Sequence, residues 1–443
     1  MHKRFRVWGV LALLAASVGE AQLLRPQGYQ GPIPVGRVDG VREVGPLWAL
    51  AVDRSESGEQ NVWLAGTRVL SLSKGVWQAR DLATGKLVWQ AADAGRVMAT
   101  TDSGVLLTQK RVLTRRRASD GQVQWRVTLP TEVRDIKVQA GTLYVTTLAG
   151  MMAPNDAPGV MALDGATGKT RWQAQELEMT EFSGAVQGVA FWNAYRGEPH
   201  FPGVHAFDNA TGKPLYRFGA TVGPLVVGDA QVLVKDFGAP GPDDRAQLQW
   251  VDLRSGKVRR QLNLAADFQC PGGNMIQHTG NEAFYAAPFV YVLDQCGQRL
   301  RQFEATGRAA GETPQKPVRT FAAPDDGRYR LGPVGEYLLF ESRAGELRLI
   351  PTTGRSPVSL NGVTMPTGTG LVIPGGGQVS RLDAWGNKVY VGRVGGSLLA
   401  YDVGTKKARY QVRLPWAGFG PTLHGGNYAV FTAPDGLAVV REP

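Results

Sequence analysis

One stretch of the sequence, ALDGATGKTRWQ, combines residue types that do chemistry in many proteins. It contains Asp164, Gly168 and Trp172 within a dozen residues. A carboxylate near a lysine and an indole could serve in acid–base catalysis or hold a cofactor. A catalytic set is needed only once, whereas an architectural element recurs, so the number of copies separates the two interpretations.

The pattern recurs along the chain. Its further clear copies contain Asp81, Gly85 and Trp89; Gly121 and Trp125; Asp208, Gly212 and Tyr216; and Asp252 and Gly256. Arg117 stands at the aspartate position of the second copy, and Arg260 stands at the aromatic position of the fifth. Weaker copies turn at Gly297, Gly354 and Gly404. The first five turn glycines are 36, 47, 44 and 44 residues apart, and a period in the forties indicates a repeat architecture. We therefore interpret the motif as structural.

Each copy predicts a hairpin. Alternating apolar residues precede the turn, as in GVMALD, and a second short strand follows it, as in KTRWQ. The aspartate can accept hydrogen bonds from neighbouring backbone, and glycine can adopt a positive φ that a Cβ would oppose. With further strand-like runs upstream, each period supplies about four strands, as in a propeller blade. The aromatic residue on the outer strand is expected to pack against the adjacent blade.

The pattern A-x-D-x-x-T-G-K-x-x-W resembles the tryptophan-docking repeat of pyrroloquinoline-quinone-like β-propellers over about residues 45–443. This resemblance implies an all-β fold, an eight-bladed propeller with four-stranded antiparallel blades. Residues 45–53 are expected to close the ring by pairing with the C-terminal strands. A complete blade for every motif in addition to this closing blade would give nine, and we predict eight.

The resembled superfamily contains quinoprotein alcohol dehydrogenases and the BamB-like accessory proteins of outer-membrane barrel assembly. The enzymes carry adjacent cysteines, whereas this chain has only Cys270 and Cys296, and it contains no CxxCH haem-attachment motif. We therefore predict no catalytic residues, no cofactor and no metal site. The leading hypothesis is a non-enzymatic scaffold for partner proteins of the cell envelope. Alternatives are a quinoprotein-like enzyme or quinone sensor, and a module that binds cell-wall polysaccharide.

The N-terminal residues predict export. Lys3, Arg4 and Arg6 precede a short apolar run, Val7–Val18, and Gly19 and Ala21 place small residues at the expected cleavage site. We expect residues 1–21 to be a cleaved signal peptide and residues 22–44 to be an extension. No cysteine lies near the expected cleavage site, so a periplasmic or secreted protein is predicted, not a lipoprotein. No later transmembrane segment and no nucleic-acid partner are expected. The formal charge of +11 favours association with an anionic surface or polysaccharide.

Two further features are candidates for function. The two cysteines can form a disulfide in an oxidising compartment or remain buried thiols. The stretch FWNAYRGEPHFPGVH, residues 191–205, is interpreted as an aromatic insertion in the fourth blade. It is either a partner-binding patch or a loop that folds onto its own blade. Its candidate residues are Phe191, Trp192, Tyr195, His200 and Phe201.

Overall fold

The computed structural model describes most of the chain from residue 38 onward. The described residues are 38, 40–54, 61–92, 95–148, 158–175, 179–196, 201–218, 221–227, 231–236, 247–263, 283–293, 298–305, 316–323, 327–342, 345–353, 359–360, 363–364, 371–373, 379–416 and 418–443. The expected signal peptide, both cysteines and His200 lie outside them. No helix within the described ranges is long and apolar enough to span a membrane.

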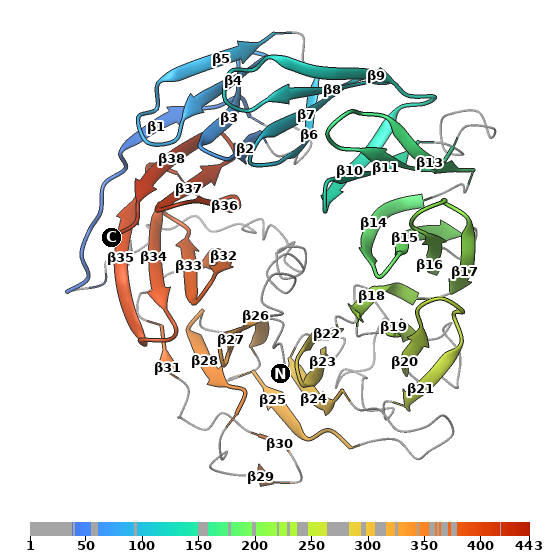
Figure 1. Ribbon diagram of the computed structural model, residues 1–443. Coiled ribbons are helices and arrows are strands. Elements are labelled where there is room, and N and C mark those ends of the chain that lie inside the picture. Colours follow the sequence, from blue (N-terminus) through green and yellow to red (C-terminus); the bar gives the residue numbers. More distant parts are fainter. Residues whose placement is uncertain are drawn as a thin grey trace, which may run out of the picture.

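The described part of the chain folds into sheets that follow one another around a ring, the architecture of a β-propeller (Figure 1). The first three sheets each contain four consecutive antiparallel strands. They are β2 (Val62–Ala65), β3 (Arg68–Ser73), β4 (Val76–Asp81) and β5 (Leu87–Ala91); β6 (Arg96–Thr100), β7 (Gly104–Gln109), β8 (Val112–Arg117) and β9 (Val123–Thr128); and β10 (Val133–Gln139), β11 (Thr142–Thr147), β12 (Val160–Asp164) and β13 (Thr170–Ala174).

The next three sheets continue this order. They are β14 (Met179–Val186), β15 (Val189–Arg196), β16 (Phe201–Asp208) and β17 (Pro214–Phe218); β18 (Thr221–Val227), β19 (Gln231–Asp236), β20 (Gln247–Asp252) and β21 (Val258–Asn263); and β22 (Ala283–Ala286), β23 (Phe289–Leu293), β24 (Arg299–Glu304) and β25 (Arg319–Ala322). The sixth sheet is extended by β30 (Val363–Thr364), which pairs parallel to β25, and by β29 (Ser359–Leu360).

The remaining sheets close the ring. They are β26 (Arg328–Val334), β27 (Tyr337–Glu341), β28 (Leu347–Pro351) and β31 (Leu371–Val372); β32 (Val379–Trp385), β33 (Lys388–Arg393), β34 (Ser397–Asp402) and β35 (Lys407–Arg413); and β36 (Thr422–Gly425), β37 (Tyr428–Ala433) and β38 (Gly436–Arg441) with β1 (Trp48–Ala51). The pairing of β1 with β38 is the closure expected for residues 45–53.

The described residues form nine sheets, one more than the eight blades that we predicted. The difference arises because eight sheets precede the closing one, which is itself complete with four strands. The prediction assumed that one of the weaker motifs did not mark a blade of its own. The all-β class is confirmed, and eight of the nine described sheets are four-stranded and antiparallel, the sixth sheet being the exception.

The core lies between sheets. Middle strands such as β7 and β11 are buried along almost their whole length, because both faces of each sheet are covered by neighbouring sheets. Outer strands instead alternate, as in β5, where Trp89 and Ala91 are buried and the other three residues are exposed. One cluster joins Leu70 and Trp77 of the first sheet to Val105 of the second. Equivalent apolar clusters link successive sheets, so that each one buries its surface against its neighbours.

The seam between the eighth sheet (β32–β35) and the closing sheet, which we call the closing seam, also contains a largely buried polar contact. Glu442, directly after β38, accepts hydrogen bonds from the hydroxyls of Tyr390 (2.5 Å) and Tyr410 (2.9 Å) and forms an ion pair with Lys388 (3.0 Å). Burial raises the pKa of Glu442, but these three partners outweigh it and the pKa is lowered overall. The penultimate residue of the chain therefore joins the closing sheet to the sheet before it.

Candidate functional site

The turn aspartates act on their own backbone. In the third sheet, Asp164 Oδ1 accepts hydrogen bonds from the backbone N–H of Thr167 (2.9 Å) and from its hydroxyl (2.9 Å). Asp164 Oδ2 accepts from Arg171 at 2.7 Å. The hydrogen bonds from Arg171 and Thr167 lower the pKa of Asp164 to about 2. A carboxylate held in its ionised form by its own turn is a poor general acid or base near neutral pH.

The other turns repeat this arrangement with different ion pairs. Thr84, Thr211 and Ser255 donate to Asp81, Asp208 and Asp252 through both backbone and hydroxyl, at 2.8–3.0 Å. The second carboxylate oxygen of each aspartate binds an arginine, in the pairs Arg68–Asp81, Arg254–Asp208 and Arg259–Asp252. In the turn at Gly121, where Arg117 replaces the aspartate, Asp120 accepts from Gln122 N–H (3.0 Å) and from Arg117 (2.8 Å). A carboxylate thus supports that turn from a different position.

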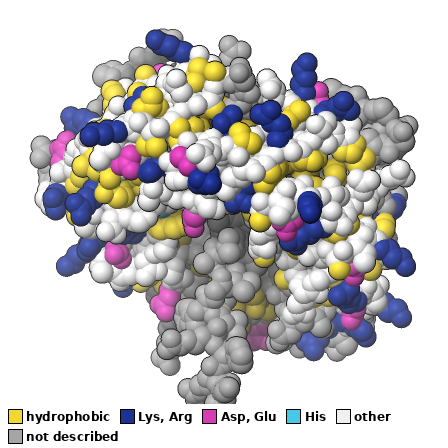
Figure 2. Space-filling model, turned by 45° about the horizontal axis from the view of Figure 1, so that its top comes forward, with side chains coloured by type: hydrophobic (Ala, Val, Ile, Leu, Met, Phe, Trp, Pro, Cys, Tyr) yellow, Lys and Arg dark blue, Asp and Glu magenta, His cyan; other side chains and the backbone are white. Residues whose placement is uncertain are grey.

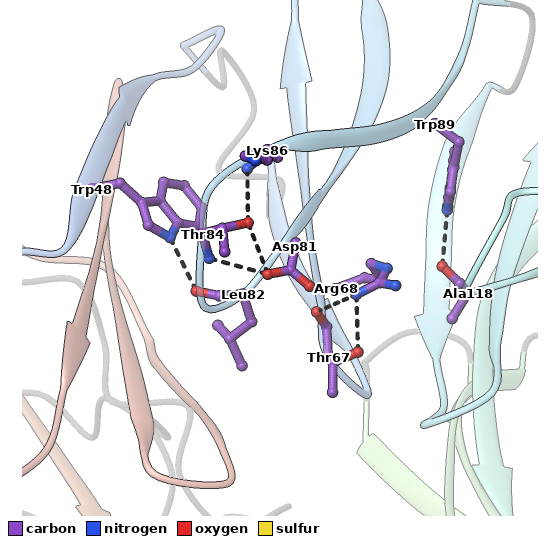
Figure 3. Close-up of polar contacts among 9 residues, drawn as sticks. All are labelled: Trp48, Thr67, Arg68, Asp81, Leu82, Thr84, Lys86, Trp89 and Ala118. Carbon is purple, nitrogen blue, oxygen red and sulfur yellow. Dashed lines mark hydrogen bonds and ion pairs between the residues drawn. The ribbon is translucent and has the colours of Figure 1, made fainter.

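Each turn receives an aromatic ring from the preceding sheet. Trp89 donates its indole N–H to the carbonyl of Ala118 at 2.8 Å (Figure 3), and its ring lies against Gly121. The acceptor always directly follows the position of the turn aspartate. The other donor and acceptor pairs are Trp48 and Leu82, Trp125 and Gly165, Trp172 and Asn209, and Tyr216 and Leu253, at 2.8–3.2 Å.

The turn glycines are required for two reasons. Gly85, Gly121, Gly168, Gly212 and Gly256 all have φ between +69° and +73°, which disfavours residues with a Cβ. A Cβ added at Gly212 would also lie 2.5 Å from the Trp172 ring, and the other four would lie 2.5–2.8 Å from their docked rings. The glycine therefore allows both the turn and close contact with the ring.

Trp48 is a docking residue that sequence analysis did not identify. It lies on β1 in the closing sheet, and its indole N–H donates to Leu82 O at 3.0 Å (Figure 3). Its ring packs against Gly85 of the first sheet. The repeat motif does not precede Trp48, since Gly40 and Val44 stand at the aspartate and glycine positions. The strand that pairs with β1 is β38, from the other end of the chain. A Trp 37 residues before the first turn glycine, close to the repeat period, was the available signal.

The prediction that residues 191–205 form an aromatic insertion is wrong for residues 191–196 and 201–205, the part of the stretch that the structure describes. Phe191 and Trp192 lie on β15 and are fully buried, and β15 pairs with β16 from Val189 to Arg196. Trp192 packs edge-on against Phe182 and Trp172 inside the seam between sheets. These aromatics follow strand periodicity, so Phe191 and Trp192 are core residues. Tyr195 and Phe201 belong to β15 and β16, and His200 lies outside the described residues.

A second polar group lies at the closing seam. His424 on β36 stacks on Trp385 with ring centroids 5.0 Å apart and lies 4.7 Å from Tyr390. Both its ring nitrogens are buried and accept or donate no hydrogen bond in the described structure. Burial lowers the pKa of His424 to about 4, so the ring is neutral at pH 7. The described residues contain no group of three or more His, Cys, Asp or Glu side chains arranged to hold a metal ion.

Comparison with known proteins gives a family match over part of the chain. Residues 73–198 match the family model described as outer membrane protein assembly factor BamB. No curated protein matches the sequence. These matched residues include the turns at Gly85, Gly121 and Gly168.

Similar solved structures include proteins with different activities. BamB from Moraxella catarrhalis is 14% identical, with 90% of this chain and 99% of that chain covered and a TM-score of 0.45. A quinohemoprotein alcohol dehydrogenase, ADHIIG, from Pseudomonas putida HK5 is also 14% identical, with 91% and 76% covered and a TM-score of 0.45. The computationally designed Ika8 protein is 13% identical, with 90% and 99% covered and a TM-score of 0.47. These likenesses do not separate a binding protein from an enzyme. The family match over residues 73–198, together with the docked turns, supports a relationship of these repeats to the pyrroloquinoline-quinone-like β-propellers.

Proposed function

We propose that this protein is an exported, non-enzymatic propeller scaffold that binds other proteins of the cell envelope. The match of residues 73–198 to a family described as an outer-membrane assembly factor is the observation that carries the proposal. The basic leader-like N-terminus supports export to the periplasm or beyond.

The contacts of the repeated polar and aromatic residues support the proposal of a scaffold. The turn aspartates bind their own turns and neighbouring arginines, and the aromatic residues dock on the next sheet. The residues whose types could have served in catalysis are thus used for turn formation and packing. We expect a partner to bind at the periphery of the ring and its loops, because exposed loops commonly carry binding residues.

A binding assay in the envelope tests this function. The tagged full-length protein is expressed in a host that exports it, crosslinked in intact cells, and recovered from detergent-solubilised envelope. We expect a defined envelope protein to be recovered in a constant ratio to the bait. Recovery of polysaccharide without protein would contradict the proposal and favour the polymer-binding alternative.

A thermal-shift assay tests the enzyme alternative separately. Pyrroloquinoline quinone with Ca²⁺ is titrated into the purified protein while the melting temperature is followed. A ligand that binds only the folded state raises the melting temperature in a saturable way. We expect no such rise, and a saturable one would contradict the non-enzymatic proposal.

A further inference from the structure

The outer edges of the first five sheets form a series of strand edges around the ring. The edge strands are β5, β9, β13, β17 and β21, and in the described part of the chain no strand pairs with their outer sides. An edge strand presents backbone N–H and C=O groups that can pair with another extended chain. We refer to these five strands as the open edges.

Two other outer edges of the ring are covered by extended segments of this same chain. Residues 42–44 lie parallel to β35, with Val44 N–H donating to Gln411 O and Gln411 N–H donating to Arg42 O, both at 2.8 Å. The Gln411 side chain also accepts from Val38 N–H at 3.0 Å. On the sixth sheet, β30 pairs parallel to β25. Outer edges in this fold therefore accept an added strand in two separate places.

The open edges carry positive charge and lack acidic residues. The five strands and the residue before each contain no Asp or Glu. Their exposed cations are Lys86, Arg126, Lys169, Arg171, Lys213, Arg217, Lys257, Arg259 and Arg260. Arg171 and Arg259 form ion pairs with the turn aspartates of their own sheets. Leaving Arg217 aside as well, the other side chains of this set add six positive charges to the open edges, which favours an anionic ligand.

Apolar side chains lie between these cations. Leu87 and Val88 on β5, Val123 on β9 and Val258 on β21 are each 40–46% exposed. On the side of the molecule where β5 and β9 come forward, hydrophobic and basic side chains lie next to one another (Figure 2). A ligand that satisfies both would present apolar and acidic groups in alternation.

We propose that the open edges bind an extended, acidic polypeptide segment of a partner protein by strand addition. This inference rests on the proposed scaffold function and names the chemistry of its partner. Main-chain hydrogen bonds along the edge would give affinity, and acidic and apolar side chains would give selectivity. A lipid headgroup or polysaccharide phosphate could match the charge but not the row of backbone donors and acceptors.

Strand β9 gives the sharpest place for a test. Leu129 N–H donates to Arg111 O, and Val112 faces Thr128 in the β8–β9 register. Because hydrogen-bonded and non-hydrogen-bonded pairs alternate in an antiparallel ladder, the N–H groups of Thr128 and Arg126 face away from β8. Proline at position 128 would remove one outward donor without removing a ladder hydrogen bond, and proline is tolerated at such edge positions.

The experiment uses the full-length protein and three synthetic peptides of equal length. Their sequences alternate Glu with Val, Lys with Val, or Glu with Pro. We expect the Glu–Val peptide to bind at least tenfold more tightly than either other peptide in fluorescence anisotropy. Binding of the Glu–Val peptide should slow backbone amide hydrogen exchange in the segments that contain the open edges. Equal binding of the Glu–Pro peptide would overturn strand addition, and equal binding of the Lys–Val peptide would overturn the charge argument.

Variants locate the site. Thr128→Pro should abolish the peptide-dependent protection of residues 122–129 and leave that of residues 86–91, whereas the matched control Thr128→Ala should retain both. Arg126→Glu should weaken protection at β9, whereas Arg409→Glu on the covered edge β35 should leave it unchanged. Unaltered protection in Thr128→Pro and Arg126→Glu would overturn the proposal. If envelope proteins are recovered with the bait but the Glu–Val peptide does not bind, the inference fails while the scaffold function stands.

Discussion

The early and late sheets of the ring solve the same packing problem in different ways. At the five seams from the closing sheet to the fifth, an aromatic ring docks on a turn glycine and donates a hydrogen bond to the carbonyl of the residue directly after the turn-aspartate position. Between the sixth and seventh sheets, the described contacts instead include a stack of Phe284, Tyr291 and Tyr329, with ring centroids 5.0 and 5.8 Å apart. At the closing seam, Glu442 accepts hydrogen bonds from two tyrosine hydroxyls and forms an ion pair with a lysine.

This difference teaches why the repeat fades along the sequence. A docked ring and its glycine are fixed at the same positions in every copy, so the motif is visible from residue types alone. Aromatic stacking and a buried carboxylate depend on local pairs that need not recur. The late seams are packed by buried apolar clusters even where the motif is weak. Loss of the motif therefore does not mean loss of a sheet.

The largest expected effect is the loss of a docked ring. Trp172 is 6% exposed and contacts Phe207 and Trp192 as well as Gly212. Trp172→Ala should lower the free energy of unfolding by about 3–5 kcal/mol, as large aromatic truncations in cores do. Urea denaturation followed by circular dichroism measures this change.

Trp385 provides the matched control for that substitution, since its side chain is 56% exposed. Trp385→Ala should cost less than about 1 kcal/mol because most of its ring is already in water. Equal losses in the two variants would mean that burial at the docking seam is not what stabilises the early sheets.

A smaller effect is expected from adding a Cβ at a docking glycine. Gly212 and Gly75 have the same φ of +73°, but only at Gly212 would the Cβ meet a ring. Gly75→Ala should cost about 1–2 kcal/mol for the backbone conformation alone. Gly212→Ala should cost about 1–3 kcal/mol more because of overpacking. Thermal and urea unfolding of both variants give the comparison, and equal costs would remove the steric argument.

The smallest effect concerns the closing seam and depends on pH. Burial lowers the pKa of His424 to about 4, so the unfolded chain binds a proton there at a higher pH than the folded chain. The stability from the neutral ring is complete above about pH 6.5 and is lost as the pH falls towards 4. The loss between pH 6.5 and pH 5 should be about 1–2 kcal/mol.

His424→Phe keeps an aromatic ring between Trp385 and Tyr390 but cannot titrate. The difference in unfolding free energy between wild type and this variant should change across pH 4–6.5 and be constant above that window. Asp383, Lys388 and Glu442 also act on His424 electrostatically, and they are retained in the variant. A difference that is independent of pH would show that His424 does not titrate in this window.

The sequence predicts the structure of each turn better than it predicts the number of sheets in the ring. The turn, the glycine and the aromatic residue follow from short-range rules, and all five clear copies lie where the repeat places them. The number of sheets depends on whether weak motifs still form strands, which is decided by contacts between residues far apart in the chain. For the same reason, Trp48 could not be assigned a docking role before its pairing with the C-terminal strand was known. Phe191 and Trp192 were misplaced because a strand rich in large aromatics resembles a loop insertion when its partner strand is not yet fixed.

The most direct test of the docking account is a double-mutant cycle between Trp172 and Gly212. If the ring causes the cost of a Cβ at position 212, then Gly212→Ala should cost only about 1–2 kcal/mol in a Trp172→Ala background, the value expected at Gly75. The same free-energy cost for Gly212→Ala in the presence and absence of the Trp172 ring would contradict the claim that the two residues form one interlocking contact.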